Sequence, residues 1–141
     1  MTDPRALYHE TIVEHDRHPH HEGPLPNATH SATVDNPLCG DVVTMHFVVE
    51  DGVIRDAAFE GRGCALSRAS ASIATDRAIG QTPEQLLDLA GRLGEFLQSG
   101  PDDAPPRDLG ELEIFGGVRS FKSRRMCACL PFRALTSALR S

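Results

Sequence analysis

The sequence lacks the features that mark membrane, secreted and nucleic-acid-binding proteins. No uninterrupted apolar run approaches the roughly 20 residues that a membrane-spanning helix needs. Residues 1–6 do not show the basic-then-apolar pattern of a secretory signal. The formal net charge is −6, whereas a general nucleic-acid-binding protein presents a basic face. We therefore expect a cytoplasmic protein that binds neither membranes nor nucleic acids.

Several catalytic and architectural signatures are also missing. The sequence contains no glycine-rich phosphate-binding loop, no internal repeat, and no Ser/His/Asp arrangement that can be placed from the sequence alone. Its cysteines do not form CxxC pairs, so no generic zinc rule selects them. With 141 residues, 40% of them hydrophobic and 24% charged, the composition fits one ordinary globular domain over 1–141.

The first half of the chain predicts a helix followed by strands. Apolar spacing and turn residues give a helix over 4–16, a loop over 18–31, a possible strand over 31–35, and a hairpin of strands 43–49 and 53–60 joined by Asp51-Gly52. Because helices follow these strands, we expect an α+β domain. It would contain a small antiparallel sheet of about three strands with helices packed on one face.

The second half predicts mainly helices. They are expected over 65–79, from the Thr82-Pro83-Glu84-Gln85 cap onward, in a short turn at 108–111 that Gly116-Gly117 breaks, and over 123–140, where Pro131 should kink the helix or begin it. The second helix carries Leu86, Leu89, Leu93 and Phe96 at three- and four-residue spacing, which predicts core positions.

The four cysteines are candidates for chemistry. They are Cys39, Cys64, Cys127 and Cys129. In a reducing compartment they are metal ligands or reactive thiols more often than disulfides, and the alternative is that they pack in the core as small apolar groups. Cys39 precedes the first hairpin strand and Cys64 follows the second. Because a hairpin runs out and back, both cysteines should lie at the same end of the sheet.

Neighbouring residues extend this cluster. Asp41 lies two residues after Cys39, so in extended backbone its carboxylate points the same way as the sulfur. Cys64 precedes a helix, whose N-terminal amides favour a thiolate. Cys127 could complete a set of three thiolates and one carboxylate, which suits tetrahedral zinc. A shared metal site is therefore one interpretation of the spacing, beside that of core cysteines.

Several motifs in the chain resemble the SufU/IscU family, which has a SufE/NifU-like fold. They are Asn-Pro-x-Cys-Gly-Asp at 36–41, Phe-Glu-Gly-x-Gly-Cys at 59–64, Ser-x-Ala-Ser at 67–70, Leu-Gly to Gly-Val over 109–118, and Arg-x-Cys-Ala-x-Leu at 125–130. The resemblance covers nearly the whole chain from the first helix onward. Two features look like the SufU branch: the segment 98–107 resembles its insertion, and Met126 stands where scaffold members commonly carry histidine.

The resemblance implies a zinc-dependent sulfurtransferase. Proteins of the SufU branch bind zinc and accept sulfur from the persulfide of a cysteine desulfurase, a SufS-like enzyme that uses pyridoxal phosphate. Carried over by motif, the zinc ligands would be Cys39, Asp41, Cys64 and Cys127. Cys39 would be the sulfur acceptor, and Arg125 would lie near the site, where it could hold a released thiolate or Asp41. A monomer is compatible with the sequence.

Two alternatives stay open for this site. The same ligands could hold a [2Fe–2S] cluster on an assembly scaffold, because thiolates suit iron–sulfur clusters as well as zinc. A purely structural zinc site is the third interpretation. Cys129, where threonine is common in the family, could be a second nucleophile.

The histidines are expected to be less informative. His15, His18, His20 and His21 are interpreted as a solvated loop cluster. His46 is interpreted as a surface or half-buried strand residue.

Overall fold

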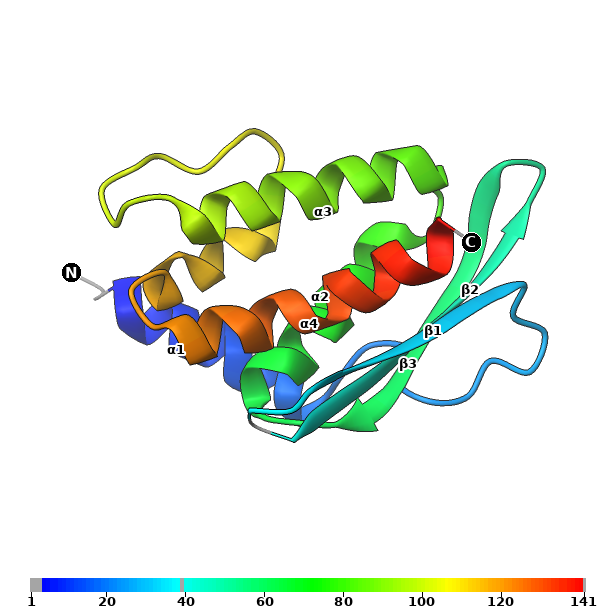
Figure 1. Cartoon of the computed structure of the whole chain (residues 1–141), viewed down its shortest axis with the longest axis horizontal. Coiled ribbons are helices and arrows are strands. Elements are labelled where there is room, and N and C mark those ends of the chain that lie inside the picture. Colours follow the sequence, from blue (N-terminus) through cyan, green and yellow to red (C-terminus); the bar gives the residue numbers. More distant parts are fainter. Residues whose placement is uncertain (1–3, 39, 141) are drawn as a thin grey trace.

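Three antiparallel strands form a sheet in the order β1–β2–β3, as predicted (Figure 1). The structure is a computed structural model, and it describes residues 4–38 and 40–140. The strands are β1 (His30–Asn36), β2 (Asp41–Glu50) and β3 (Val53–Arg62). Asp51 and Gly52 both have positive φ, 53° and 77°, as a tight two-residue hairpin turn requires. The predicted hairpin is therefore confirmed.

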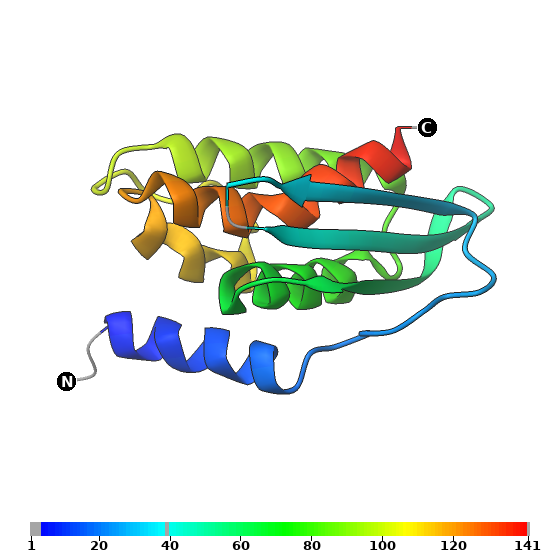
Figure 2. The same cartoon turned by 60° about the horizontal axis from the view of Figure 1, so that its bottom comes forward.

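Helices cover one face of this sheet, so the predicted α+β class is confirmed. They are α1 (Pro4–Arg17), α2 (Ala65–Ala78), α3 (Pro83–Gln98), the 3₁₀ helix η1 (Gly110–Val118) and α4 (Lys122–Leu139). Helix α4 packs on β1 and β2, and α2 packs on β3 and α4. Helix α3 packs on the outer side of α4, while α1 packs on α2 (Figures 1 and 2). Among the described residues, no helix has the length and apolar character needed to span a membrane.

The core lies between the sheet and the helices. On β2 the alternate residues Val43, Met45 and Phe47 are buried, as period-two spacing predicts. The four apolar positions predicted on α3 are also buried: Leu86, Leu89, Leu93 and Phe96. The predicted capping box of this helix is present, since the Thr82 hydroxyl accepts a hydrogen bond from the Gln85 amide and the Gln85 side chain accepts one from the Thr82 amide.

The predicted break at Gly116-Gly117 and the predicted helix start at Pro131 are both wrong, while the alternative of a kink at Pro131 stays a prediction. Gly116 and Gly117 do not break the short helix, because η1 continues to Val118. A Cβ at Gly116 would lie 2.9 Å from Cζ of Phe96, so this glycine allows close packing on α3. Helix α4 does not begin at Pro131 but runs through it, and Pro131 is buried. Tertiary packing thus outweighs the cost of an internal proline, which is about 3 kcal/mol.

A buried contact ties α2 to α4 beside that proline. Pro131 has no N–H to donate to the preceding turn of the helix. The Ser70 hydroxyl donates a hydrogen bond of 2.6 Å to the Ala128 carbonyl in this turn. The contact holds the second turn of α2 against the second turn of α4, which carries Cys127.

Arginines fix the segment between α3 and η1. Arg119 donates hydrogen bonds to the carbonyls of Pro101 and Asp103 and to the Ser99 hydroxyl, all within 3.0 Å. Arg77 donates to the carbonyls of Asp108 and Leu109 at 2.8 Å each. The segment between α3 and η1 therefore lies in a defined position against α2, α3 and η1.

Candidate metal centre

Three of the four predicted ligands meet at one end of the sheet. Asp41 is the first residue of β2, Cys64 is the N-cap of α2, and Cys127 lies on the second turn of α4. Their ligand atoms, one carboxylate oxygen and two sulfurs, all lie within 4.8 Å of one another. Asp41 and Cys127 are 5% and 6% exposed, whereas Cys64 is open to solvent. The site therefore has a buried floor and an accessible side.

The fourth predicted ligand, Cys39, lies outside the described residues. Its neighbours in sequence belong to the turn between β1 and β2, which closes on the paired residues Asn36 and Asp41. In this turn the Gly40 amide donates to the Asn36 carbonyl at 2.8 Å, and the Leu38 amide donates to the Asn36 side-chain oxygen at 3.1 Å. Leu38 is 73% exposed, so the turn carries an apolar side chain into solvent.

Ser67 holds two of the candidate ligands in place. Its hydroxyl lies 3.1 Å from an Asp41 carboxylate oxygen and 3.1 Å from the Cys64 carbonyl, and it can donate to either. The Cys64 sulfur lies 3.9 Å from the same hydroxyl. Ser67 belongs to a motif noted in the sequence, but its role was not predicted. Its position three residues after an N-cap, where helix side chains turn back toward the cap, was the available signal.

Two glycines before Cys64 are required by close approach. A Cβ at Gly63 would lie 2.3 Å from the Ser67 hydroxyl and 3.0 Å from the Asp41 carboxyl carbon. At Gly61, φ is 152° and a Cβ would lie 2.1 Å from the Val42 carbonyl oxygen. The glycines of the 59–64 motif therefore let β3 pass close to the start of β2, which brings Cys64 beside Asp41.

Arg125 lies on another face of α4 from the candidate ligands. It is two residues before Cys127, which places the two side chains about 200° apart around the helix axis. Arg125 lines a hollow together with Cys129 and Arg133. Burial raises the pKa of the Cys129 thiol, while the nearby guanidinium groups of Arg133 and Arg125 lower it in part. The role of Arg125 at the ligands stays a prediction from the resemblance.

The expectation of a solvated histidine loop is wrong for His15. This residue lies on α1 and is 5% exposed. Its Nδ1 is 2.8 Å from the Ser72 hydroxyl on α2, and its Nε2 is 3.0 Å from a Glu111 carboxylate oxygen on η1. The expectation failed because burial of His15 depends on two elements that are distant in sequence.

The other histidines lie nearer the surface. The more exposed His20 and His21 both contact the Asp76 carboxylate. His46 is half-buried on β2, as predicted, and lies 2.7 Å from both the Ser31 hydroxyl and a Glu60 carboxylate oxygen.

Ser72, His15 and Glu111 form the serine–histidine–acid chain that could not be placed from the sequence. Ser72 is 0% exposed, however, and its hydroxyl also accepts a hydrogen bond of 2.8 Å from the His20 amide. A nucleophile must reach a substrate, and this hydroxyl cannot. The arrangement therefore fastens α1 to α2 and η1.

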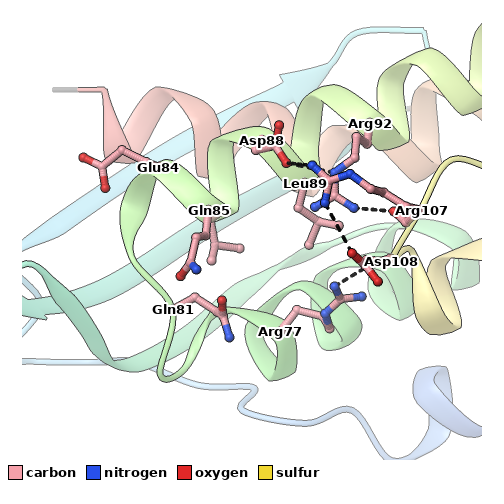
Figure 3. Close-up of a pocket in the computed structure, with 10 residues that line it drawn as sticks. Arg77, Gln81, Glu84, Gln85, Asp88, Leu89, Arg92, Arg107 and Asp108 are labelled. Atoms are coloured by element: carbon pink, nitrogen blue, oxygen red, sulfur yellow. Dashed lines mark hydrogen bonds and ion pairs between the residues drawn. The ribbon is translucent and has the colours of Figure 1, made fainter.

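A second hollow of about 600 Å³ lies between α3, the end of α2 and the segment before η1 (Figure 3). Its charged side chains interact with one another and with the backbone. Arg92 donates to the Asp88 carboxylate at 2.9 Å, and Arg107 lies 3.8 Å from Asp88 and 3.3 Å from Asp108. Since its cations already have partners, we interpret this hollow as the place where the segment before η1 is attached to α2 and α3.

The fold and the gathered side chains define a small α+β protein with two thiols and a carboxylate at one end of a three-stranded sheet. Residues 7–128 match the family described as the NifU-like N-terminal domain. The chain belongs to this family.

Curated relatives agree with this assignment. The chain is 37% identical over 134 residues to the iron–sulfur cluster assembly scaffold protein IscU of Streptococcus pyogenes, covering 95% of this chain and 83% of the relative. It is 34% identical over 130 residues to the zinc-dependent sulfurtransferase SufU of Bacillus subtilis, covering 92% and 87%.

A solved structure agrees as well. A nitrogen-fixing NifU-like protein (N-terminal) from Brucella abortus superposes with a TM-score of 0.85 at 30% identity, covering 95% of this chain and 92% of that one.

Proposed function

We propose that this chain is a cytoplasmic sulfur carrier of iron–sulfur cluster assembly. It takes a sulfur atom from the persulfide of a cysteine desulfurase of the SufS type, and it holds zinc with Cys39, Asp41, Cys64 and Cys127. The observation that carries the proposal is the meeting of the Asp41, Cys64 and Cys127 ligand atoms within 4.8 Å. The similarity to a zinc-dependent sulfurtransferase of Bacillus subtilis supports it.

The donor set fits zinc. Two cysteine sulfurs and one carboxylate oxygen are ligands that zinc accepts, and a further thiolate from the turn between Asn36 and Asp41 would complete four. Bound zinc would keep the cysteines as thiolates at neutral pH. Ser67, which donates to Asp41 or to the Cys64 carbonyl, would orient the carboxylate from behind, as outer partners of metal ligands do.

The transfer step is a thiol–disulfide type exchange. The Cys39 thiolate attacks the outer sulfur of the desulfurase persulfide and forms a new S–S bond to it. The bond between that sulfur and the desulfurase cysteine breaks, and this cysteine leaves as a thiolate. One persulfide is consumed and one is formed, so no external oxidant or reductant is needed.

The turn between β1 and β2, which contains the proposed acceptor Cys39, is suited to contact with a partner protein. Gly40 has φ of 76°, a conformation that side chains rarely adopt, and the exposed Leu38 stands on the other side of Cys39 in the sequence. An exposed leucine next to a nucleophile offers an apolar contact to the desulfurase. In this proposal Arg125 assists by holding a released thiolate or Asp41 after α4 or its side chain has moved.

The segment 98–107 supports assignment to the SufU branch. Its residues after Gln98, which ends α3, form a loop that Arg119 and Arg92 hold by donating to the carbonyls of Pro101, Asp103 and Arg107. Within the proposal this loop is the insertion that distinguishes sulfur carriers from scaffolds.

A scaffold that builds a [2Fe–2S] cluster on the same ligands is the second candidate. It is favoured by the 37% identity to a relative named as an IscU scaffold. Metal analysis and the visible spectrum of protein purified without oxygen distinguish the two. Colourless protein with about one zinc per chain fits the carrier, whereas brown protein with iron and sulfide fits the scaffold.

The first prediction tests the acceptor directly. Cys39→Ala should abolish uptake of persulfide sulfur from the desulfurase, measured by mass spectrometry as the gain of one sulfur atom, and should leave the fold intact by circular dichroism. Cys129→Ser is the matched control, because Cys129 lies on the opposite face of α4 from Cys127, and it should accept sulfur normally. Uptake by Cys39→Ala at the wild-type rate would show that Cys39 is not the acceptor.

A further inference from the structure

Among the residues that the structure describes, four cationic side chains and no acidic one line a groove between α3 and α4. Two adjoining hollows of about 500 and 420 Å³ share Cys129 and Arg133 and follow the facing sides of the two helices. The cations are Lys122, Arg125, Arg133 and Arg140. We call this feature the cationic groove.

The cations form one stripe along α4. The α4 residues Lys122, Arg125, Cys129 and Arg133 and the C-cap residue Arg140 are separated by three, four, four and seven residues, the spacing of one helix face. At 1.5 Å per residue the stripe is roughly 27 Å long. The groove is therefore long enough to contact several turns of a second helix.

These cations have no acidic partner in the part of the chain that the structure describes. The ion pairs there involve other cationic residues, namely Arg68, Arg92, Arg107 and the histidines at 15, 20, 21 and 46. The acids of α3 face elsewhere: Glu84 and Asp88 line the hollow of Figure 3, and Glu95 lines another small one. A chain of net charge −6 thus keeps one strongly positive surface.

The floor of the groove is apolar and open. Leu87, Ala90 and Cys129 are partly buried and pack against the core. Gly91 and Gly94 lie in the middle of α3, and a Cβ at either position would meet nothing within 4 Å. Glycine lowers helix stability relative to alanine, and no close contact requires it at these two positions. Its effect is to leave room for another backbone to approach α3.

We propose that the cationic groove binds an acidic amphipathic helix of a partner protein. The apolar stripe of such a helix would cover Leu87, Ala90 and the glycines, while carboxylates on its flanks would pair with the cations of α4. Charge complementarity favours an acidic partner, and the apolar floor favours a helix over a nucleic acid. Because Cys127 points to the other side of α4, the helix could bind while the candidate metal centre stays accessible.

The test uses the full chain and a defined probe. The probe is a fluorescent synthetic helix of 18 residues with a leucine stripe flanked by glutamates, followed by fluorescence anisotropy. We expect saturable binding that weakens as salt is raised, because exposed charges are screened. Arg133→Glu with Arg140→Glu should weaken binding by roughly tenfold, since like charges then face each other. Arg17→Glu with Arg55→Glu changes the net charge equally at exposed sites elsewhere and should bind normally.

A second variant distinguishes binding in the groove from attraction by charge alone. Gly91→Leu places a side chain at an exposed position of the groove, where its Cβ would meet nothing within 4 Å, so the melting temperature should not fall while peptide binding is lost. Equal weakening by both charge pairs, or unchanged binding by Gly91→Leu, would overturn the proposal. Three further outcomes would also overturn it. The first is no binding at millimolar peptide, and the second is binding of anionic phosphatidylglycerol vesicles in place of the peptide. The third is a salt-sensitive dimer of the chain alone in sedimentation.

Discussion

At the scale of single residues, the candidate centre depends on Gly63, which has no side chain. Gly63 allows the Ser67 hydroxyl and the Asp41 carboxyl carbon to lie 2.3 and 3.0 Å from the position a Cβ would occupy. A hydrogen is the only substituent that fits there. The glycine therefore sets the distance between the strand that carries Asp41 and the helix that begins after Cys64.

We predict that Gly63→Ala weakens zinc binding and lowers the free energy of unfolding by about 1–3 kcal/mol, the usual cost of overpacking. Urea denaturation and a competitive chelator titration measure the two effects. Gly117→Ala is the matched control, because a Cβ there meets nothing within 4 Å. If the two variants behaved alike, the close approach at Gly63 would not matter.

A second prediction at this scale concerns thiol reactivity. The pKa of Cys129 is raised by burial, against the opposing effect of Arg133 and Arg125, so less thiolate is present at a given pH. Alkylation of Cys129 by iodoacetamide should be slower near neutral pH than alkylation of an ordinary thiol, and should still accelerate at a pH where an ordinary thiol is already ionised. Peptide mapping by mass spectrometry follows the rate. Arg133→Glu should slow the reaction further, and an unchanged or faster rate would contradict this account.

At the scale of elements, α1 is fastened through a buried histidine. His15 contacts Ser72 on α2 and Glu111 on η1, so one side chain joins three helices. We predict that His15→Ala lowers the free energy of unfolding by about 1–3 kcal/mol, because the buried Ser72 hydroxyl loses one of its two partners and a cavity replaces the buried imidazole. Hydrogen exchange of the α1 amides should also become faster. The exposed His18, changed to Ala, should leave both measurements unchanged, and an equally silent His15→Ala would show that α1 is held by other contacts.

Elements with local signals were predictable from the sequence. The hairpin of β2 and β3 follows from period-two alternation and an Asp-Gly turn, and the start of α3 follows from its capping box. The passage of η1 through Gly116-Gly117 and of α4 through Pro131 could not be predicted. Glycine pairs and proline usually end helices, and only packing against distant elements keeps these two helices intact.

The candidate site was predictable to a similar degree. Hairpin geometry alone places Asp41 near Cys64, since β2 begins at Asp41 and β3 ends two residues before Cys64, at the same end of the hairpin. The position of Cys127 depends on how α4 crosses β1 and β2, which no local pattern fixes. The same limit applies to Ser67 and Arg125, because the direction of a side chain depends on which helix face is buried.

At the scale of the whole molecule, the proposed zinc would connect three elements. Its ligands come from the start of β2, the start of α2 and α4. We predict that a strong chelator lowers the melting temperature of the zinc-loaded protein by several degrees. A ligand present at 100 times its dissociation constant stabilises the folded state by about 2.7 kcal/mol. Asp41→Ala should melt at the same temperature with and without chelator, and a chelator-insensitive wild type would argue against a zinc link.

The sequence separation of the gathered side chains has a consequence for biosynthesis. Asp41 and Cys64 leave the ribosome early, whereas Cys127 follows 63 positions after Cys64. A nascent chain that ends before α4 therefore presents an incomplete pocket, open to oxidation or to the wrong ion. Because a domain generally folds as a unit, the proposed zinc would find all of its ligands together only after α4 is translated and has docked on the sheet.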